Sequence, residues 1–380
     1  MKAKKILTAL LAGACLFGMS AVTSSVVKAE EVIKVGVFLP LTGDNAAGGE
    51  LELRGVKLAN EVHPKVLGKK IVLVVQDNKS DKAEAANVVA RLIEKDKVCA
   101  ILGSYGSSLS MAAGNIVKDN KIPAIGTSCT NPQVTKGNDY YFRACFIDPF
   151  QGTVMANYIK KNGHKKVAVI QEVSNDYSVG LAKFFMDAYK GMGGKILDVA
   201  NYQTGDKDFT AILTNVKAKN PDAIYAPGNF TESALLIAQA HQLGLKVPFY
   251  GGDTWETADF LEVGGEDVEG AMLTTAFGRE MASTKEAKDF LAIFAKQFPN
   301  EEPSALTALA YDAYMLAYYG IEKAGSADPV AIRNAIAANK NLPLVTGNTT
   351  LNADGDPVKG AVIKTVKKGK FVYVDFVQPK

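Results

Sequence analysis

Short apolar segments alternate with amphipathic segments along most of this chain, and this alternation restricts the fold more than any other feature. In the first half, the apolar and mostly β-branched segments are 32–39, 71–76, 98–102 and 122–125. Runs of this kind are typical of parallel strands covered on both faces. Between them, residues 81–94 place their apolar side chains on one helical face, with Asp81 near the capping position. Right-handed crossovers then predict a doubly wound α/β lobe.

The same alternation restarts after Asp148 and Pro149, which predicts a second lobe of the same architecture. The expected helices are 150–161, 177–189, 209–219 and 232–243, and the expected strands are 166–171, 196–202, 223–225 and 247–250. Later segments predict helices over 285–298 and 305–323 and a closing strand pair over 361–367 and 371–377. Two lobes also suit a chain of this length. Helices after the second lobe indicate that the chain crosses back to the first, so several connections would form a hinge.

The first 29 residues are typical of a secretory signal sequence. Lys2, Lys4 and Lys5 precede an apolar stretch of roughly 14 residues, and 27–29 offer a small-x-small cleavage site. The stretch is too short to span a bilayer comfortably. An alternative interpretation takes Cys15 as the lipidated residue of a lipoprotein signal, but Ala12 stands where leucine is preferred and the apolar run continues past Cys15. We therefore expect an exported, periplasmic protein.

The charge balance excludes two classes of partner. The signal segment contains four lysines and no acidic residue, so 39 of the 43 basic side chains remain against 40 acidic ones. A near-neutral chain without clustered Lys and Arg is not expected to bind nucleic acid. No polybasic run suits lipid head groups, and no second long apolar stretch predicts a membrane span.

Three cysteines remain after residue 29, namely Cys99, Cys129 and Cys145. One disulfide with one buried thiol is one reading, and three small core residues is the other.

Two hydroxyl-rich turns directly follow apolar strands. They are Gly-Ser-Tyr-Gly-Ser-Ser at 103–108 and Gly-Thr-Ser-Cys-Thr-Asn-Pro at 126–132. Open α/β sheets place their ligand crevice at the C-terminal ends of strands, so the two turns are candidates to bind a small polar head group.

Several segments, in order over nearly the whole chain after the signal, resemble the periplasmic leucine, isoleucine and valine-binding proteins of ABC transporters. The matching segments are 35–43, 103–107, Asn131 with Pro132, Arg143 with Asp148, Gln151 with Gly152, 177–180, 221–223 and 310–313. The resemblance implies a type I periplasmic binding protein, with two Rossmann-like lobes joined by three hinge segments. By position, the hinges fall near Phe146, 275–277 and 345–350. The implied N-terminal lobe comprises 30–146 plus 278–346, and the C-terminal lobe comprises 147–277 plus 347–380.

The resemblance implies a carboxylate site at the two turns. Ser107 matches the serine that binds the amino acid carboxylate, and Ser128, Cys129 and Thr130 match the second turn. Hydroxyls, main-chain donors and a helix N-terminus after Ser107 suit a carboxylate. The alternative is that these residues merely cap helices.

The resemblance also implies an ammonium site on the other lobe. Asp253 matches an acidic residue that is usually Glu, and Tyr177 matches an aromatic position that covers the ligand. Asn229 or Phe230 stands in the place of a further tyrosine, and Asn229 could offer a carbonyl oxygen. For Asp253, the alternative is a helix cap.

The side-chain pocket departs from the family pattern. Gly48 stands where relatives carry an aromatic residue, Leu306 stands near a tyrosine position, and Tyr105 replaces an aliphatic residue. These changes reshape the cavity. A branched aliphatic amino acid is the first expectation, and a larger apolar or aromatic one that fills the space over Gly48 is the second.

The sequence does not predict an enzyme. His63, His164 and His241 are scattered, with no two at metal-ligand spacing, and no Ser-His-Asp set is apparent. No GxGxxG motif or Walker loop occurs, so we expect no cofactor. Residues 352–356 weakly resemble a calcium loop but lack the later Glu, so a hairpin turn is expected and no metal site.

These expectations combine into a monomeric solute receptor that closes around a free amino acid and delivers it to the membrane permease of an ABC transporter. One alternative is a sensor domain that presents the ligand to a signalling receptor. Another is a binding protein for an aromatic or larger apolar amino acid, an amide or a urea-like solute.

Overall fold

The computed structural model describes residues 31–379, and the compact unit described below begins at Val32. The predicted signal segment 1–29 and the alternative lipidation site Cys15 lie outside the described residues. None of the described helices has the length and apolar character that a membrane span requires.

Six strands form the first sheet, in the order β2–β3–β1–β4–β5–β6. Their bounds are β1 Val32–Leu39, β2 Lys65–Val66, β3 Lys69–Asp77, β4 Ala100–Leu102, β5 Ala124–Gly126 and β6 Tyr141–Arg143. Neighbours run parallel except β2 and β3, which are antiparallel. Because β3 and β4 lie on opposite sides of β1, the sheet is wound in both directions, which confirms the predicted doubly wound lobe.

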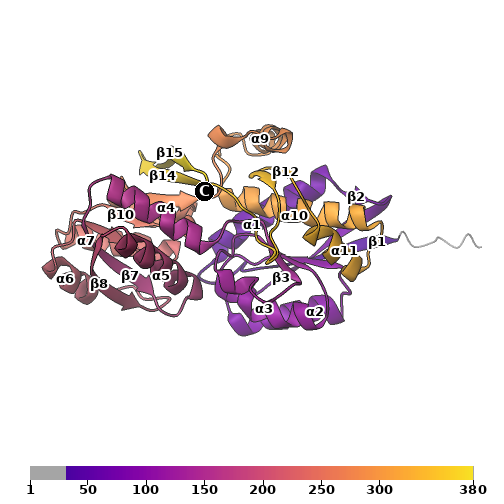
Figure 1. The fold of residues 1–380 in the computed structure, drawn as a ribbon, viewed down its shortest axis with the longest axis horizontal. Coiled ribbons are helices and arrows are strands. Elements are labelled where there is room, and N and C mark those ends of the chain that lie inside the picture. The colour runs from indigo at the N-terminus through magenta and orange to yellow at the C-terminus, as the bar shows by residue number, and fades with distance from the viewer. Residues whose placement is uncertain (1–30, 380) are drawn as a thin grey trace, which may run out of the picture. The chain divides into compact units, whose positions relative to one another are not determined.

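Helices cover both faces of this sheet. They are α1 Ala46–Val62, α2 Lys82–Glu94, α3 Ser107–Asp119, α9 Lys285–Gln297, α10 Ala305–Ala324 and α11 Pro329–Ala337. Val35 and Val37 of β1 pack in the cluster that contains α1 and α10, whereas Phe38 packs in the cluster that contains α2 and α3. The late helix α10 lies beside α1 (Figure 1), so the chain does return to the first sheet.

Glycine allows the close approach of α1 and α10. A Cβ atom at Gly55 would lie 2.1 Å from the main-chain oxygen of Thr307. The Thr307 hydroxyl donates a hydrogen bond to the Leu51 carbonyl at 3.0 Å. Helix α1 therefore takes its position from tertiary packing rather than from helix propensity.

Seven strands form the second sheet, in the order β15–β14–β11–β10–β9–β7–β8. Their bounds are β7 Lys166–Glu172, β8 Lys195–Tyr202, β9 Ala223–Tyr225, β10 Phe249–Gly251, β11 Met272–Thr275, β14 Ala361–Lys367 and β15 Lys370–Val377. The strands from β8 to β11 run parallel, and β14 and β15 add antiparallel neighbours. The predicted closing strand pair is thus part of this sheet.

The second sheet is also covered on both faces. Its helices are α4 Asp148–Lys161, α5 Asp176–Gly191, α6 Thr210–Ala218, α7 Phe230–Gln242 and α8 Ala258–Gly264. Val167 and Val169 pack against α4 and α5, while Ala168 and Ile170 pack in the cluster with α6 and α7. Short 3₁₀ turns occur at Pro132–Val134, Asp253–Trp255, Gly265–Val268 and Arg279–Met281.

The chain passes between the two sheets three times. It does so after β6, after β11, and between β13 (Gly347–Thr349) and β14; β13 pairs only with β12 (Leu342–Leu344) in a two-stranded ribbon. The exact lobe limits at 146, 277 and 346 remain predictions.

Buried ion pairs lie near these crossings. Arg143 Nε lies 2.6 Å from Asp356, and Lys364 Nζ lies 2.5 Å from Glu256. A third pair joins Lys359 to Asp312, which also accepts hydrogen bonds from the backbone at 345 and 346. A buried pair that loses one partner leaves an uncompensated charge, so each pair restricts the local path of the chain.

The three cysteines at 99, 129 and 145 are buried and free. The sequence left open whether two of these cysteines form a disulfide or all three are small core residues. The structure supports the second alternative.

Candidate functional site

The first hydroxyl-rich turn connects β4 to α3, at the C-terminal edge of the first sheet. Ser107 is the first residue of α3, and its hydroxyl oxygen accepts a hydrogen bond from the Asn131 backbone N–H at 3.1 Å. The hydroxyl proton of Ser107 remains available to a ligand. Because Asn131 belongs to the second turn, this bond joins the two turns as the sequence predicted from their strand positions.

The second turn follows β5 and is held from behind by Glu52 of α1. The hydroxyls of Thr127 and Ser128 each donate a hydrogen bond of 2.5 Å to the Glu52 carboxyl group. Burial raises the pKa of Glu52 from 4.5 to about 8. The Ser128 hydroxyl is thus engaged with Glu52, whereas the buried Thr130 hydroxyl lies beside the buried carboxyl group of Asp148.

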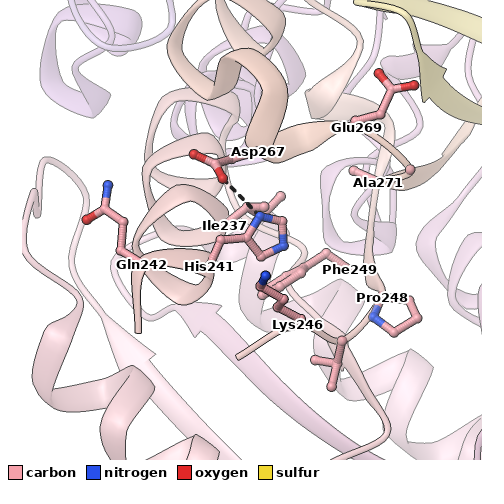
Figure 2. Close-up of a pocket in the computed structure, with 11 residues that line it drawn as sticks. Ile237, His241, Gln242, Lys246, Pro248, Phe249, Asp267, Glu269 and Ala271 are labelled. Atoms are coloured by element: carbon pink, nitrogen blue, oxygen red, sulfur yellow. Dashed lines mark hydrogen bonds and ion pairs between the residues drawn. The ribbon is translucent and has the colours of Figure 1, made fainter. Parts of the chain in front are cut away.

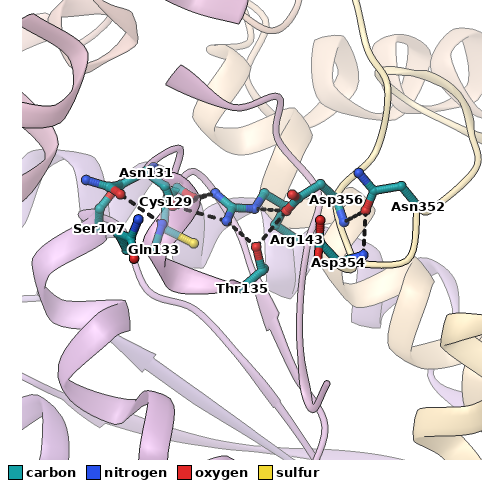
Figure 3. A network of polar contacts seen from close by, with 9 residues as sticks. All are labelled: Ser107, Cys129, Asn131, Gln133, Thr135, Arg143, Asn352, Asp354 and Asp356. Atoms are coloured by element: carbon teal, nitrogen blue, oxygen red, sulfur yellow. Dashed lines mark hydrogen bonds and ion pairs between the residues drawn. The ribbon is translucent and has the colours of Figure 1, made fainter. Parts of the chain in front are cut away.

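Arg143 holds the backbone of the second turn in place. Its guanidinium group donates hydrogen bonds to the carbonyls of Cys129 and Asn131 and to the Thr135 hydroxyl, and it pairs with Asp356 (Figure 3). Arg143 is fully buried. A planar, permanently charged group with five donors suits this role. The turn is thereby connected to the loop that leads into β14.

The Cys129 side chain, which was predicted as part of the site, packs instead in the core cluster of α2 and α3. Its Sγ atom lies 2.2 Å from the position that a Cβ atom at Gly126 would occupy. Only the backbone of Cys129 remains a candidate part of the site.

Asp253 follows β10, at the C-terminal edge of the second sheet. Gln151 Nε2 and the Tyr177 hydroxyl each donate a hydrogen bond of 2.8 Å to Asp253 Oδ1. Among the described residues, both bonds fall on this one oxygen, which leaves Oδ2 for a ligand donor. Burial raises the pKa of Asp253 from 3.8 to about 6, so the carboxylate is mostly ionised at neutral pH.

A cavity of about 80 Å³ lies between these groups. Of the predicted site residues, Tyr105, Ser107, Ser128, Tyr177 and Asn229 line it. Asp253 adjoins it through its bond to Tyr177. The structure therefore brings residues from both sheets to one cavity.

The remaining predicted residues do not line the cavity. Thr130 is buried beside it in the second turn, and Phe230 and Leu306 lie in the apolar core. At Gly48, an added Cβ atom would lie 2.4 Å from the ring of Tyr105. The expectation of free space over Gly48 for a larger ligand is therefore wrong, because the Tyr105 ring occupies that space.

Glu172, at the end of β7, is a further cavity residue that sequence reasoning missed. Its carboxyl group accepts hydrogen bonds from the Asn229 backbone at 3.2 Å and the Asn229 side chain at 3.4 Å. Burial raises its pKa, and the nearby Glu232 adds to this effect. Its place at the C-terminal end of a predicted parallel strand was the signal that could have identified it. Glu52 and Gln151 gave no comparable signal, since only the fold brings them to the site.

Polar contacts also connect the two sides of the cavity. Asp176 at the start of α5 accepts hydrogen bonds from Ser108 at 2.8 Å and Lys82 at 2.9 Å. The side-chain amide of Asn131 donates to the Asp176 carbonyl at 2.9 Å, and an added Cβ at Gly180 would lie 2.7 Å from this amide. We call the contacts of Ser108, Lys82 and Asn131 with Asp176 the latch.

A larger hollow of about 770 Å³ lies at the opposite edge of the second sheet (Figure 2). Val247 and Pro248 line it just before β10, and Ala271 just before β11. His241 contacts Asp267 at 3.0 Å there. None of the predicted site residues lines this hollow, and ligands of open α/β sheets bind at the other strand ends. Among residues 31–379, no group of His, Cys, Asp and Glu is arranged to hold a metal ion.

Comparison with known proteins gives consistent results. The sequence model of the periplasmic binding protein family matches residues 32–370. A Leu/Ile/Val-binding protein of Rhizobium johnstonii is 32% identical over 85% of this chain and 88% of its own. The crystal structure of a leucine-binding protein from Thermotoga maritima is 40% identical, with a TM-score of 0.90 over 92% of this chain and 99% of that one. A branched-chain amino acid transporter substrate-binding protein of Streptococcus pneumoniae, in complex with isoleucine, is 34% identical, with a TM-score of 0.86 over 92% of this chain and all of its own.

Proposed function

Because this chain belongs to the periplasmic binding protein family, we propose that it is the solute-binding subunit of an ABC importer and binds a free α-amino acid between its two lobes. One observation carries the proposal. Hydroxyl groups of one lobe line a cavity whose other side carries Tyr177, and the Tyr177 hydroxyl donates to the buried carboxylate of Asp253. This arrangement complements a zwitterion.

The carboxylate half of the site consists of Ser107, Ser128, Thr130 and the backbone of the second turn. The Ser107 hydroxyl and the Thr130 hydroxyl, which lies beside the buried Asp148 carboxyl group, donate to the ligand carboxylate. The N-terminus of α3 adds a favourable partial charge. Ser128 contributes its backbone, since its hydroxyl donates to Glu52.

The ammonium half consists of Asp253 and Tyr177. Asp253 Oδ2 accepts from the ligand ammonium, while Gln151 and Tyr177 hold Oδ1 and orient the carboxylate. A charge-assisted hydrogen bond in a buried site is stronger than one between neutral groups. Closure is a population shift, because a ligand that contacts both halves stabilises the closed form that the permease recognises.

The ligand side chain follows from the relatives. Proteins named for leucine, isoleucine and valine binding share 30–40% identity with this chain over most of its length. A branched aliphatic amino acid is therefore the first candidate. We infer further that the protein acts as an exported monomer without catalytic activity; the family to which it belongs supports the periplasmic location.

A thermal-shift screen of the common amino acids, followed by calorimetry, tests this proposal. A bound ligand raises the melting temperature by mass action. Asp253→Asn should weaken binding by about 100-fold, because it strands the ammonium without changing the shape of the side chain. Asp259→Asn, an exposed aspartate on α8 of the same lobe, is the matched control and should bind as the wild type does. If no amino acid shifts the wild type, or if Asp253→Asn binds with unchanged affinity, the proposal is refuted.

A further inference from the structure

Glu172 connects the loops that follow three adjacent strands of the second sheet, β7, β8 and β9. Its Oε1 atom accepts hydrogen bonds from the Thr204 hydroxyl, after β8, and from the Asn229 side-chain amide, after β9, the latter at 3.4 Å. Its Oε2 atom accepts from the Asn175 side-chain amide at 3.1 Å and from the Asn229 backbone N–H at 3.2 Å. All four residues line the cavity. One carboxyl group therefore ties together much of the second-lobe side of the cavity wall.

The four partner groups require an acceptor on both oxygens of this side chain. Each of them donates its hydrogen bond to Glu172, and an ionised carboxylate offers acceptors on both oxygens. Burial raises the pKa of Glu172, while the hydrogen bonds from its partners favour the ionised form and act in the opposite direction. A glutamine of the same shape would turn an NH₂ group toward two of the four donors. The contacts thus depend on the chemistry of the carboxylate as well as on its shape.

One of these contacts leads to the proposed ammonium half. Asn175 is the N-cap of α5, and its side-chain oxygen accepts from the Tyr177 backbone N–H at 3.1 Å. The Tyr177 hydroxyl in turn donates to Asp253 at 2.8 Å. The Asn175 amide is therefore held at both ends, by Glu172 and by the first turn of α5. A shift of Asn175 would move the start of α5 and with it Tyr177.

We propose that Glu172 is a positioning residue of the amino acid site, which holds the loops after β7, β8 and β9 in the arrangement that places Tyr177 against Asp253. The inference rests on the proposed function, since it concerns the same cavity. Glu172 acts through Asn175 and the other wall residues, so the proposal requires no contact between its carboxylate and the ligand.

A swap of hydrogen-bond polarity between Glu172 and Asn175 tests the proposal, with leucine, isoleucine and valine as probes and the other common amino acids if none of these binds. Glu172→Gln should weaken binding about tenfold, because it sets donors against donors. Asn175→Asp sets a carboxylate against a carboxylate and should weaken binding by a similar factor. In the double variant the new amide can donate to the new carboxylate, so affinity should return to within about threefold of the wild type. Calorimetry well below the melting temperature of each variant measures the affinity of folded protein, which a purely structural role would leave unchanged.

The matched control is Glu232→Gln, in the first turn of α7. Glu232 is also a buried glutamate of the second lobe. One of its oxygens accepts from the Gly205 backbone N–H at 2.8 Å, and the other has no hydrogen-bond partner among residues 31–379. A glutamine can keep this single bond through its own oxygen, so affinity should stay within about twofold of the wild type.

Wild-type affinity in Glu172→Gln overturns the inference while the proposed function stands. Equal weakening in Glu232→Gln also overturns it, because the loss would then follow the negative charge rather than the contacts of Glu172. The same holds for a double variant in which the two single effects simply add. If Glu172→Gln does not fold, Asn175→Asp tests the same contact, and unchanged affinity in that variant overturns the inference. A wild type that binds none of the common amino acids refutes both proposals.

Discussion

The carboxylate half and the ammonium half of the candidate site are constructed in opposite ways. In the carboxylate half, neutral hydroxyls and backbone groups lie at the cavity, and the charged guanidinium of Arg143 and the mostly protonated carboxyl group of Glu52 lie one layer behind them. In the proposed ammonium half, the charged carboxylate of Asp253 is itself the group assigned to the ligand, and the neutral side chains of Gln151 and Tyr177 hold it. The carboxylate half thus depends on the buried charge of Arg143 to hold its backbone in shape. The ammonium half depends on the buried charge of Asp253 for the proposed contact with the ligand. Damage to the first should appear in stability, and damage to the second in affinity.

The largest expected effect is the removal of the charge behind the carboxylate half. Arg143→Met leaves Asp356 buried without its partner and two backbone carbonyls without their donor. The free energy of unfolding should fall by about 3–5 kcal/mol. Urea denaturation measures it. Arg279→Met, which breaks an exposed pair with Glu302, should cost at most about 1 kcal/mol. Equal losses in both variants would show that Arg143 is not a buried support of the turn.

Glu52 should make the stability of the unliganded protein depend on pH. Burial raises its pKa from 4.5 to about 8 in the folded state, so the folded protein binds an extra proton between these values. This contribution to stability is complete below about pH 4.5 and is lost as the pH rises through 8, by up to about 1.4 kcal/mol per pH unit. Glu52→Gln should flatten the profile of melting temperature against pH between pH 5 and 8. Glu50→Gln, an exposed neighbour on α1, should retain the wild-type slope, and a wild-type slope in Glu52→Gln would contradict the prediction.

Asp253 should make ligand affinity depend on pH in the opposite direction. Its carboxylate must be ionised to bind an ammonium group, and burial raises its pKa to about 6, with a further contribution from Glu256. Affinity should therefore fall by about tenfold between pH 7 and pH 5, which corresponds to about 1.4 kcal/mol. Glu52 stays largely protonated across this window. Calorimetry at the two pH values measures the change. A constant affinity would mean that Asp253 does not contact the ammonium.

The smallest expected effect concerns the latch between the two halves. Lys82→Met removes an exposed ion pair with Asp176, so ligand affinity should change by less than about threefold at low salt and by less still at high salt. Titration at two ionic strengths measures it. Lys183→Met breaks an exposed pair within α5 alone and should leave affinity unaffected at both ionic strengths. A tenfold loss in Lys82→Met would show that the latch carries much of the closure energy.

Strong periodicity made most of the fold predictable from the sequence. The predicted helices at 150–161 and 305–323 lie within two residues of α4 and α10. Helix α1 was not predicted, because Gly48, Gly49 and Gly55 lower its helix propensity and are needed for close tertiary approach. The three-residue strand β6 is too short to give a periodic signal.

The position of the candidate site was predictable for a different reason. Residues that follow parallel strands converge at one sheet edge, so the two turns could be predicted to lie together without coordinates. Asp253 was proposed instead from the resemblance to a known family. The packing of the Tyr105 ring against Gly48 could not be predicted from the sequence. These residues lie in α1 and in the first turn, and only the fold shows that the ring of one fills the space left by the other. The contact of Glu52 with the second turn was also not predicted, because only the fold brings α1 beside that turn.

The latch also bears on how long a solute stays bound. Asn131 belongs to the turn proposed to bind the ligand carboxylate, and its side chain donates to the residue that precedes Tyr177. In the proposed closure, separation of the lobes breaks this contact together with both halves of the site, so we expect the escape of the solute to follow the rate of lobe separation. A partner that pulls on α5 alone would then shorten the residence time of the solute without touching it.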